Sequence, residues 1–300
     1  MVESINANKP IFSIIIPTYN TSIVLMQCLQ SLCHQSADKS CLEVIVVNDG
    51  GKNNISENLG LSGSQLSLKY LYQEHKGPAA ARNLGIKKAK GDIIIFLDDD
   101  SLPTKDWLNA TIKAWQKSPD FDGIGGYTIS ELTDSIYCKV NSDFFNWYLD
   151  QHLSGEYCTF LVTCNAGYKK AILNKVGLFD ERFKKASGED RDLNIKIAKI
   201  GGRLRLDKDI LVYHDRDLTL RSFTRKNYNY GKAAHELYAR YPDLMRLSAK
   251  NYINFYVSIL EKYRTFKEKT MAFLLLTLSQ ISTLIGYLSA ILTKQEQKRL

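Results

Sequence analysis

The chain has 300 residues, of which 44% are hydrophobic and 24% are charged, a composition that argues against intrinsic disorder and for one large domain with an appendage. Its net charge of +8 arises in residues 201–300, which contain 18 Lys and Arg but nine Asp and Glu. That segment suits a solvated surface, phosphates, nucleic acid or an anionic membrane. The six cysteines show no C-x-x-C or zinc spacing, and residues 1–10 lack an apolar signal-peptide core. We therefore expect a reducing, cytoplasmic location.

The first half of the sequence alternates strand and helix patterns. Apolar runs predict strands at Phe12–Pro17, Glu43–Val47 and Ile93–Leu97, with a weaker strand at Leu68–Tyr72. An alanine-rich helix is expected from Pro78 to Lys90, because Pro favours the first helical turn and Gly91 ends the run. Uniformly apolar strands separated by helices indicate a parallel sheet that is covered on both faces.

Polar residues follow three of these strands, at Thr18–Asn20, Asn48–Gly51 and Asp98–Asp100. Ligands of such sheets bind at the carboxyl ends of the strands, so the three clusters should converge. Three adjacent carboxylates repel one another unless water or a cation compensates, and Mg²⁺ or Mn²⁺ suits carboxylate oxygens. A solvated turn is the alternative for Asp98–Asp100, and an ordinary turn is the alternative for Asp49 in N-D-G-G.

Further along, helices are expected at Lys105–Lys117, Asp190–Ile200 and Thr219–Tyr241, and a strand at Gly123–Ile129. The remainder of Lys105–Asp150 has no clear pattern.

Four more side chains are candidates for chemistry. Glu189 and Asp190 begin a helix, where a carboxylate either caps the helix or serves as a general base. Arg82 can pair with a phosphate, with an aspartate or with a surface carboxylate. His214 follows an apolar strand and is either structural or a ligand for metal or phosphate.

Residues 271–292 form a stretch without any charge. As a helix it would be about 33 Å long, close to the thickness of a hydrocarbon core. Three alternatives remain open: a membrane span, a helix lying in the membrane interface, and a buried packing or dimerisation helix. Basic residues on both sides suit surface association at least as well as a span.

Six motifs together resemble glycosyltransferase family 2, the inverting enzymes of GT-A fold. They cover about residues 11–215 and read S-I-I-I-P-T-Y-N, E-V-I-V-V-N-D-G-G, G-P-A-A-A-R-N-L-G-I, G-D-I-I-I-F-L-D-D-D, N-A-G-Y-K-K-A-I-L and G-E-D-R-D-L. The resemblance implies an α/β, Rossmann-like GT-A fold with a mixed central sheet and a helical C-terminal extension. We expect a transferase domain over residues 1–241 and the extension over residues 242–300.

The resemblance also implies roles for single residues. Asp190 would be the catalytic base, with Glu189 as its alternate. Asp100, Asp98 and His214 would hold Mn²⁺ or Mg²⁺, and Asn165 would lie on the acceptor side. The donor would contact Pro17, Thr18, Tyr19, Asn20, Asp49, Arg82, Asp98 and Asp99. N-D-G-G departs from the D-D-G-S that is common in the family, which affects the details of base recognition.

The expected function is transfer of a hexose from a nucleotide sugar, a UDP-sugar by resemblance, to a hydroxyl of a glycan or lipid-linked acceptor. Glycolipid or surface polysaccharide synthesis at the cytoplasmic face of a membrane would suit the basic end and the uncharged helix. A glycoside hydrolase is disfavoured because it needs no metal. A non-catalytic nucleotide-sugar or membrane-binding protein is the other alternative. Nucleic acid is not an expected partner, because the basic aromatic segment near Tyr228 equally suits diphosphate or a lipid head group.

Overall fold

The computed structural model describes residues 11–20, 23–51, 66–130, 135–214, 218–244 and 249–297. The chain forms two compact units, one comprising Met1–Ile129 with His152–His214 and the other Ser130–Gln151 with Asp215–Leu300. We call these the sheet unit and the helical unit. The domain boundary expected at residue 241 stays a prediction, because compactness does not show which segments fold independently.

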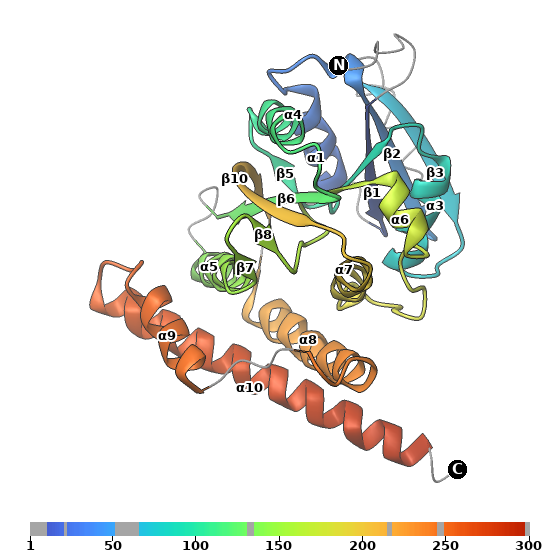
Figure 1. Cartoon of the computed structure of the whole chain (residues 1–300). Coiled ribbons are helices and arrows are strands. Elements are labelled where there is room, and N and C mark those ends of the chain that lie inside the picture. The colour runs from blue at the N-terminus through green and yellow to red at the C-terminus, as the bar shows by residue number, and fades with distance from the viewer. Residues whose placement is uncertain are drawn as a thin grey trace. The chain divides into compact units, whose positions relative to one another are not determined.

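Among the described residues, the sheet unit contains a ten-stranded sheet in the order β3-β2-β1-β4-β9-β6-β10-β8-β7, with β5 paired to β10 (Figure 1). Its strands are β1 (Phe12–Thr18), β2 (Leu42–Asp49), β3 (Ser67–Gln73), β4 (Ile93–Phe96), β5 (Leu102–Pro103), β6 (Gly123–Ile129), β7 (Leu153–Ser154), β8 (Tyr157–Cys158), β9 (Ala166–Lys169) and β10 (Leu204–Tyr213). Strands β1 to β4 run parallel, and β9 lies antiparallel between β4 and β6. The mixed, mostly parallel sheet confirms the predicted fold class.

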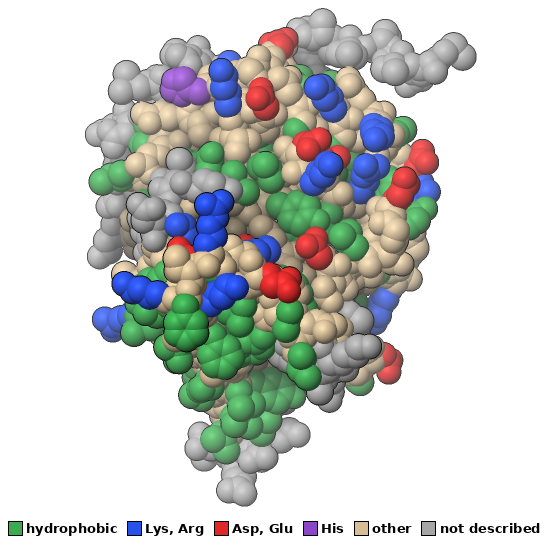
Figure 2. Space-filling view, turned by 90° about the vertical axis from the view of Figure 1, so that its left-hand side faces the viewer, with side chains coloured by type: hydrophobic (Ala, Val, Ile, Leu, Met, Phe, Trp, Pro, Cys, Tyr) green, Lys and Arg blue, Asp and Glu red, His purple; other side chains and the backbone are tan. Residues whose placement is uncertain are grey.

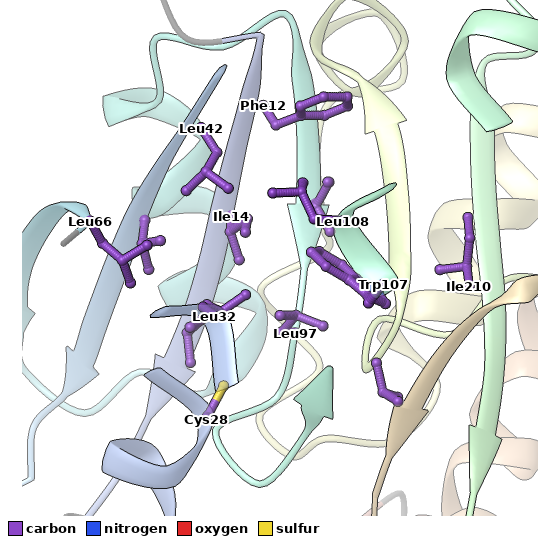
Figure 3. Packing of buried hydrophobic residues seen from close by; sticks show 14 of the residues in the cluster. Phe12, Ile14, Cys28, Leu32, Leu42, Leu66, Leu97, Trp107, Leu108 and Ile210 are labelled. Carbon is purple, nitrogen blue, oxygen red and sulfur yellow. The ribbon is translucent and has the colours of Figure 1, made fainter. Parts of the chain in front are cut away.

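Helices cover both faces of this sheet, as the apolar strands predicted. They are α1 (Ile23–Cys33), α3 (Pro78–Lys88), α4 (Trp107–Lys117), α6 (Lys170–Lys175) and α7 (Glu189–Lys199), with a short 3₁₀ turn at Lys39–Cys41. Successive side chains of a strand point to opposite faces. Accordingly Ile14 packs with α1 and α4 in one core, whereas Ile15 packs with α3 and α7 in another. Figure 3 shows the first core, where Leu32 of α1 lies near Ile14 and Cys28 lies on the side of the cluster farther from Leu42.

The helical unit consists of α5 (Ile136–Asp150), α8 (Leu220–Arg240), α9 (Ala249–Leu260) and α10 (Phe266–Gln297). A reciprocal pair of bonds between Thr219 and Ser222 caps the start of α8. Trp147, Phe223 and Phe255 contribute to a separate apolar core. Helix α5 was not predicted, although Ile136, Val140, Phe144 and Trp147 recur at helical spacings of four, four and three and pack in this core. By length and composition, Phe266–Thr293 of α10 is long and apolar enough to cross a membrane.

Candidate active site

Four strand ends bring the polar clusters to one edge of the sheet. Strands β1 and β2 are in parallel register, with Thr18 opposite Asn48. Strand β5, just after the aspartates, pairs antiparallel with the end of β10, so that Leu102 lies opposite Tyr213. This pairing brings the loop of Asp98–Asp100 beside His214, although more than a hundred residues separate them.

Asp98, Asp100 and His214 offer ligand atoms that all lie within 4.8 Å of one another. His214 Nε2 is 3.2 Å from Asp100 Oδ1 and 3.6 Å from Asp98 Oδ2. Adjacent ligands of an octahedral ion with bonds of about 2.1 Å are about 3 Å apart, so these residues fit a divalent cation. The two carboxylates supply the oxygen ligands that suit Mg²⁺ and Mn²⁺, and the imidazole adds a nitrogen ligand.

Arg82 connects this cluster to the start of α7. Its guanidinium is buried, with Nη2 2.8 Å from Asp98 Oδ1 and Nη1 2.7 Å from Glu189 Oε1. Burial opposes ionisation of Asp98, but the hydrogen bond from His214 and the charge of Arg82 outweigh it and lower the pKa of Asp98 to about 2. Asp98 is therefore a carboxylate at neutral pH. The sequence left a phosphate, an aspartate and a surface carboxylate as possible partners of Arg82. The structure shows Arg82 paired with the carboxylates of Asp98 and Glu189.

The neighbouring acids Glu189 and Asp190 have different environments. Glu189 is 2% exposed and is bound to Arg82, whereas Asp190 is half-buried. Asp190 Oδ1 accepts a hydrogen bond from the backbone N–H of Arg191 at 2.7 Å. Burial and the charge of Glu189 raise the pKa of Asp190 to about 7, against the lowering effect of Arg82. A carboxyl with such a pKa can take up and release a proton near neutrality.

The loop after β1 is held to its neighbours by side chains. Thr18 Oγ1 donates to Asp99 Oδ2 at 2.7 Å. Asn20 has a φ of 57°, in the left-handed region that Asn tolerates better than most residues. The ring of Tyr19, 48% exposed, lies 4.5 Å from the ring of His75. Pro17 is the last but one residue of β1 and precedes this loop directly.

Asp49 is buried and well supplied with hydrogen bonds from the chain. Its Oδ1 accepts from Gln73 Nε2 at 2.7 Å and from the backbone N–H of Lys76 at 2.8 Å. Its Oδ2 accepts from the backbone N–H of Gly77 at 2.9 Å, and His75 Nδ1 is also 2.9 Å away. Asp49 thus fixes the loop before α3, and its direct contact with a donor remains a prediction.

The model of the protein family described as "Glycosyl transferase family 2" matches residues 13–177, which is more than half of the chain. The chain belongs to glycosyl transferase family 2. The matched region contains Thr18, Asp49, Arg82 and Asp98–Asp100, whereas Asp190 and His214 lie beyond it.

The curated relatives of this chain include two synthases and a glycosyltransferase. A hyaluronan synthase of Pasteurella multocida is 27% identical over 235 residues, covering 67% of this chain and 24% of the relative. A chondroitin synthase of the same species is 28% identical and covers 71% and 25%. A pre-mycofactocin glycosyltransferase of Mycobacterium tuberculosis is 28% identical and covers 77% and 48%. This family 2 chain thus spans about a quarter of the two synthases.

Solved structures place the family 2 chain in the GT-A fold. A mannosyltransferase of Pyrobaculum calidifontis, in complex with GDP-Man and Mn²⁺, aligns with a TM-score of 0.67 at 19% identity. The alignment covers 97% of this chain and 88% of that one. S. aureus TarS 1-349, in complex with UDP-GlcNAc, aligns with a TM-score of 0.54 at 18% identity, covering 95% and 92%. At this level of identity the likeness shows the fold alone.

Asn165, predicted on the acceptor side, is only 2% exposed. Its Oδ1 accepts from Trp107 Nε1 at 2.9 Å, and its Nδ2 donates to the carbonyl oxygens of Tyr127 and Ile210 at 3.1 and 3.0 Å. Both amide hydrogens are therefore engaged within the sheet. An acceptor hydroxyl would have to displace one of these bonds, so contact with the acceptor remains a prediction only.

Sequence reasoning placed Asn48 in the cluster Asn48–Gly51 without giving it a role of its own, and it did not single out His75. Asn48 Oδ1 accepts from Gly51 N at 2.7 Å, and its Nδ2 donates to Gly51 O and to Tyr70 Oη at 3.1 and 2.8 Å. These donated bonds need an amide, which gives a physical reason for Asn in N-D-G-G. The aromatic contact of His75 with Tyr19 joins residues 56 positions apart and leaves no sequence signal.

Proposed function

We propose that this family 2 member transfers a hexose from a UDP-sugar to a hydroxyl group of a glycan or lipid-linked acceptor, with inversion at the anomeric carbon. The observation that carries the proposal is the convergence of Asp98, Asp100 and His214 next to the buried Arg82. Such a cluster suits the diphosphate of a donor, and Asp190, next to Glu189 at the start of α7, suits a proton acceptor.

In the proposed reaction, the carboxylate of Asp190 takes the proton of the acceptor hydroxyl as its oxygen bonds to C1 of the sugar. The bond from C1 to the diphosphate oxygen breaks, and the nucleoside diphosphate leaves with the electron pair. A divalent cation held by Asp98, Asp100 and His214 would stabilise the negative charge of the leaving diphosphate. One displacement suffices, so a single base is needed.

Arg82 positions the two halves of this site. Its pKa is raised, despite burial, by Asp98 and Glu189, so it stays a cation between them. We propose that it keeps Asp98 ionised and holds the start of α7, where Asp190 lies. The exposed ring of Tyr19 and the loop of Pro17–Asn20 would face the donor. The cytoplasmic face of a membrane, where glycolipid or surface polysaccharide precursors are extended, is the proposed location.

The decisive experiment uses Asp100→Asn and the matched control Asp209→Asn, which changes an exposed aspartate on β10. Thermal unfolding is followed with Mn²⁺ and UDP-sugars, and UDP release is measured with an acceptor. We expect Mn²⁺ with a UDP-sugar to raise the melting temperature of the wild type and of Asp209→Asn but not of Asp100→Asn. Turnover of Asp100→Asn should fall by about 100-fold or more. Undiminished turnover of Asp100→Asn in the presence of chelator would refute the proposal.

A further inference from the structure

Helix α10 presents many of its large apolar side chains outward, although Leu275 and Leu276 are buried in the core of the helical unit. The exposed hydrophobic residues of its uncharged stretch are Met271, Phe273, Leu274, Ile281, Leu284, Ile285, Leu288 and Leu292. From residue 281 they recur at spacings of three and four, so they form one stripe along the helix. We call this set the outer stripe. Figure 2 shows hydrophobic side chains gathered in the part of the view that contains the helical unit, with Lys and Arg side chains beside them.

On the opposite side of α10, the residues toward its C-terminus are small or polar. The buried positions there are Ser279, Ser282 and Gly286. A helix at the surface of a water-soluble protein normally turns its large apolar side chains inward and its polar ones outward. In this half of α10 the arrangement is reversed, so hydrocarbon rather than water matches its outer surface.

The contact between α8 and α10 is also built from small residues and hydroxyl groups. A Cβ added to Gly231 would lie 1.9 Å from Thr283 O, and one added to Gly286 would lie 2.0 Å from Tyr228 O, so the two backbones touch. Tyr228 Oη and Ser289 Oγ are 2.7 Å apart. Small residues that allow close backbone approach, together with hydroxyl bonds between helices, are the usual means of helix association in membranes.

The charged residues of α8, which packs against α10, argue against a membrane-spanning position of α10. Helix α8 carries Arg225, Lys226 and Lys232 within about two turns of its contacts with α10. If α10 crossed the bilayer while paired with α8, these charges would enter the hydrocarbon, at about 2.5–3.5 kcal/mol each near its centre. A helix lying in the interface keeps such charges in water while its apolar side contacts the acyl chains.

Basic side chains near the beginning of α10 indicate the kind of surface. Arg264, Lys267 and Lys269 are exposed, and they outnumber the exposed Glu261 and Glu268. Exposed lysines and arginines next to an apolar stripe favour anionic lipids, because each contributes electrostatic attraction near the head groups.

We propose that the outer stripe of α10 lies in the interface of an anionic membrane, with α8 covering the opposite side of the helix and neither helix crossing the bilayer. This inference concerns the helical unit and holds independently of the transfer reaction. Of the three alternatives that the sequence left open for residues 271–292, the proposal selects the helix lying in the membrane interface.

The test uses the full chain and vesicles of phosphatidylglycerol and phosphatidylcholine in equal parts. In a sedimentation assay, Leu284→Gln with Leu288→Gln should weaken binding roughly tenfold or more, because two large apolar side chains leave the acyl region. The matched control is Ile200→Gln, which changes a side chain 42% exposed on the sheet unit and should bind as the wild type does. Since Leu284 and Leu288 are exposed, the melting temperature without vesicles should not fall.

Two further measurements separate the alternatives. Binding of the wild type should weaken with salt and on pure phosphatidylcholine vesicles, and a tag after residue 300 should remain open to protease added outside sealed vesicles. Protection of the tag from protease would indicate that α10 spans the bilayer. If the double variant binds vesicles as the wild type does, and a dimer that the wild type forms is lost in the variant, the stripe is an interface between copies of the chain. Either result overturns the proposal. The variant Asp190→Asn should bind vesicles as the wild type does. Membrane binding and the transfer mechanism are therefore tested independently of each other.

Discussion

At the scale of single residues, the site depends on which carboxylates the buried guanidinium group of Arg82 binds. Arg82 binds Asp98 and Glu189 at 2.8 and 2.7 Å, and this leaves Asp190 as the acid of the pair that is not ion-paired among the described residues. Two adjacent acids of the same helix turn thereby acquire different properties. The sequence names both as candidates, the family resemblance prefers Asp190, and the ion pair of Arg82 with Glu189 supports the same choice.

The first prediction concerns pH. The basic form of Asp190 is its carboxylate, and its pKa is raised to about 7, so transfer should be lost as pH falls below that value. The rate with saturating donor should rise about tenfold per pH unit below pH 7 and level off above it. Asp190→Asn should reduce the rate by about 100-fold or more and abolish this dependence. A wild-type rate independent of pH between 5 and 8 would contradict the assignment; Asp209→Asn serves as the control.

The second prediction concerns Asn165. Asn165→Asp keeps the shape but replaces two donated bonds, to Tyr127 O and Ile210 O, by contacts between oxygens. We expect the free energy of unfolding to fall by about 2–4 kcal/mol, because buried polar groups lose their partners. Chemical denaturation measures this loss. Unchanged stability with a raised KM for the acceptor would instead support the acceptor-side role predicted from the sequence.

At the scale of elements, the packing of α8 against α10 explains two glycines that helix propensity alone would disfavour. Gly231 lies inside α8 and would normally weaken the helix, yet it allows the backbone of α10 to approach. The same holds for Gly286 on α10. Neither glycine ends a helix or stands in a turn, so the need for a small residue arises from the contact between the two helices.

The third prediction follows from this contact. Gly→Ala inside an exposed helix stabilises it by about 1 kcal/mol, but a Cβ at Gly231 would lie 1.9 Å from Thr283 O. Gly231→Ala should therefore lower the free energy of unfolding by about 1–3 kcal/mol. Glu236→Ala, at an exposed position of the same helix, should change it by less than about 0.5 kcal/mol. A more stable Gly231→Ala variant would show that the helices do not pack closely.

At the scale of the whole molecule, the chain is stabilised by apolar cores and has no disulfide among its six cysteines. Cys28, Cys138, Cys158 and Cys164 are buried, and burial raises the pKa of Cys158 to about 12. Such thiols act as small hydrophobes and are poorly reactive, because the thiolate is the reactive form.

The fourth prediction is the reactivity of these thiols. Cys33 and Cys41 are only half-buried, so they should react first with a thiol reagent at neutral pH, and all six should react after denaturation. Burial also raises the pKa of both, so their labelling should be slower than that of a free thiol. Mass spectrometry after timed labelling measures the order. Rapid labelling of Cys158 in the folded protein would contradict the packing described for it.

The sequence by itself determined the layered α/β fold and the edge of the sheet at which the polar clusters meet. Hydrophobic runs such as Ile93–Leu97 are local, and each strand carries its own polar cluster at its carboxyl end, so the common edge follows from parallel pairing. Only the tertiary structure decided which side chains meet. The pairing of β5 with β10 brings His214 to Asp100, Arg82 joins Asp98 to Glu189, and Gly286 meets Tyr228. These contacts depend on register and helix packing between distant segments, and no local pattern encodes them.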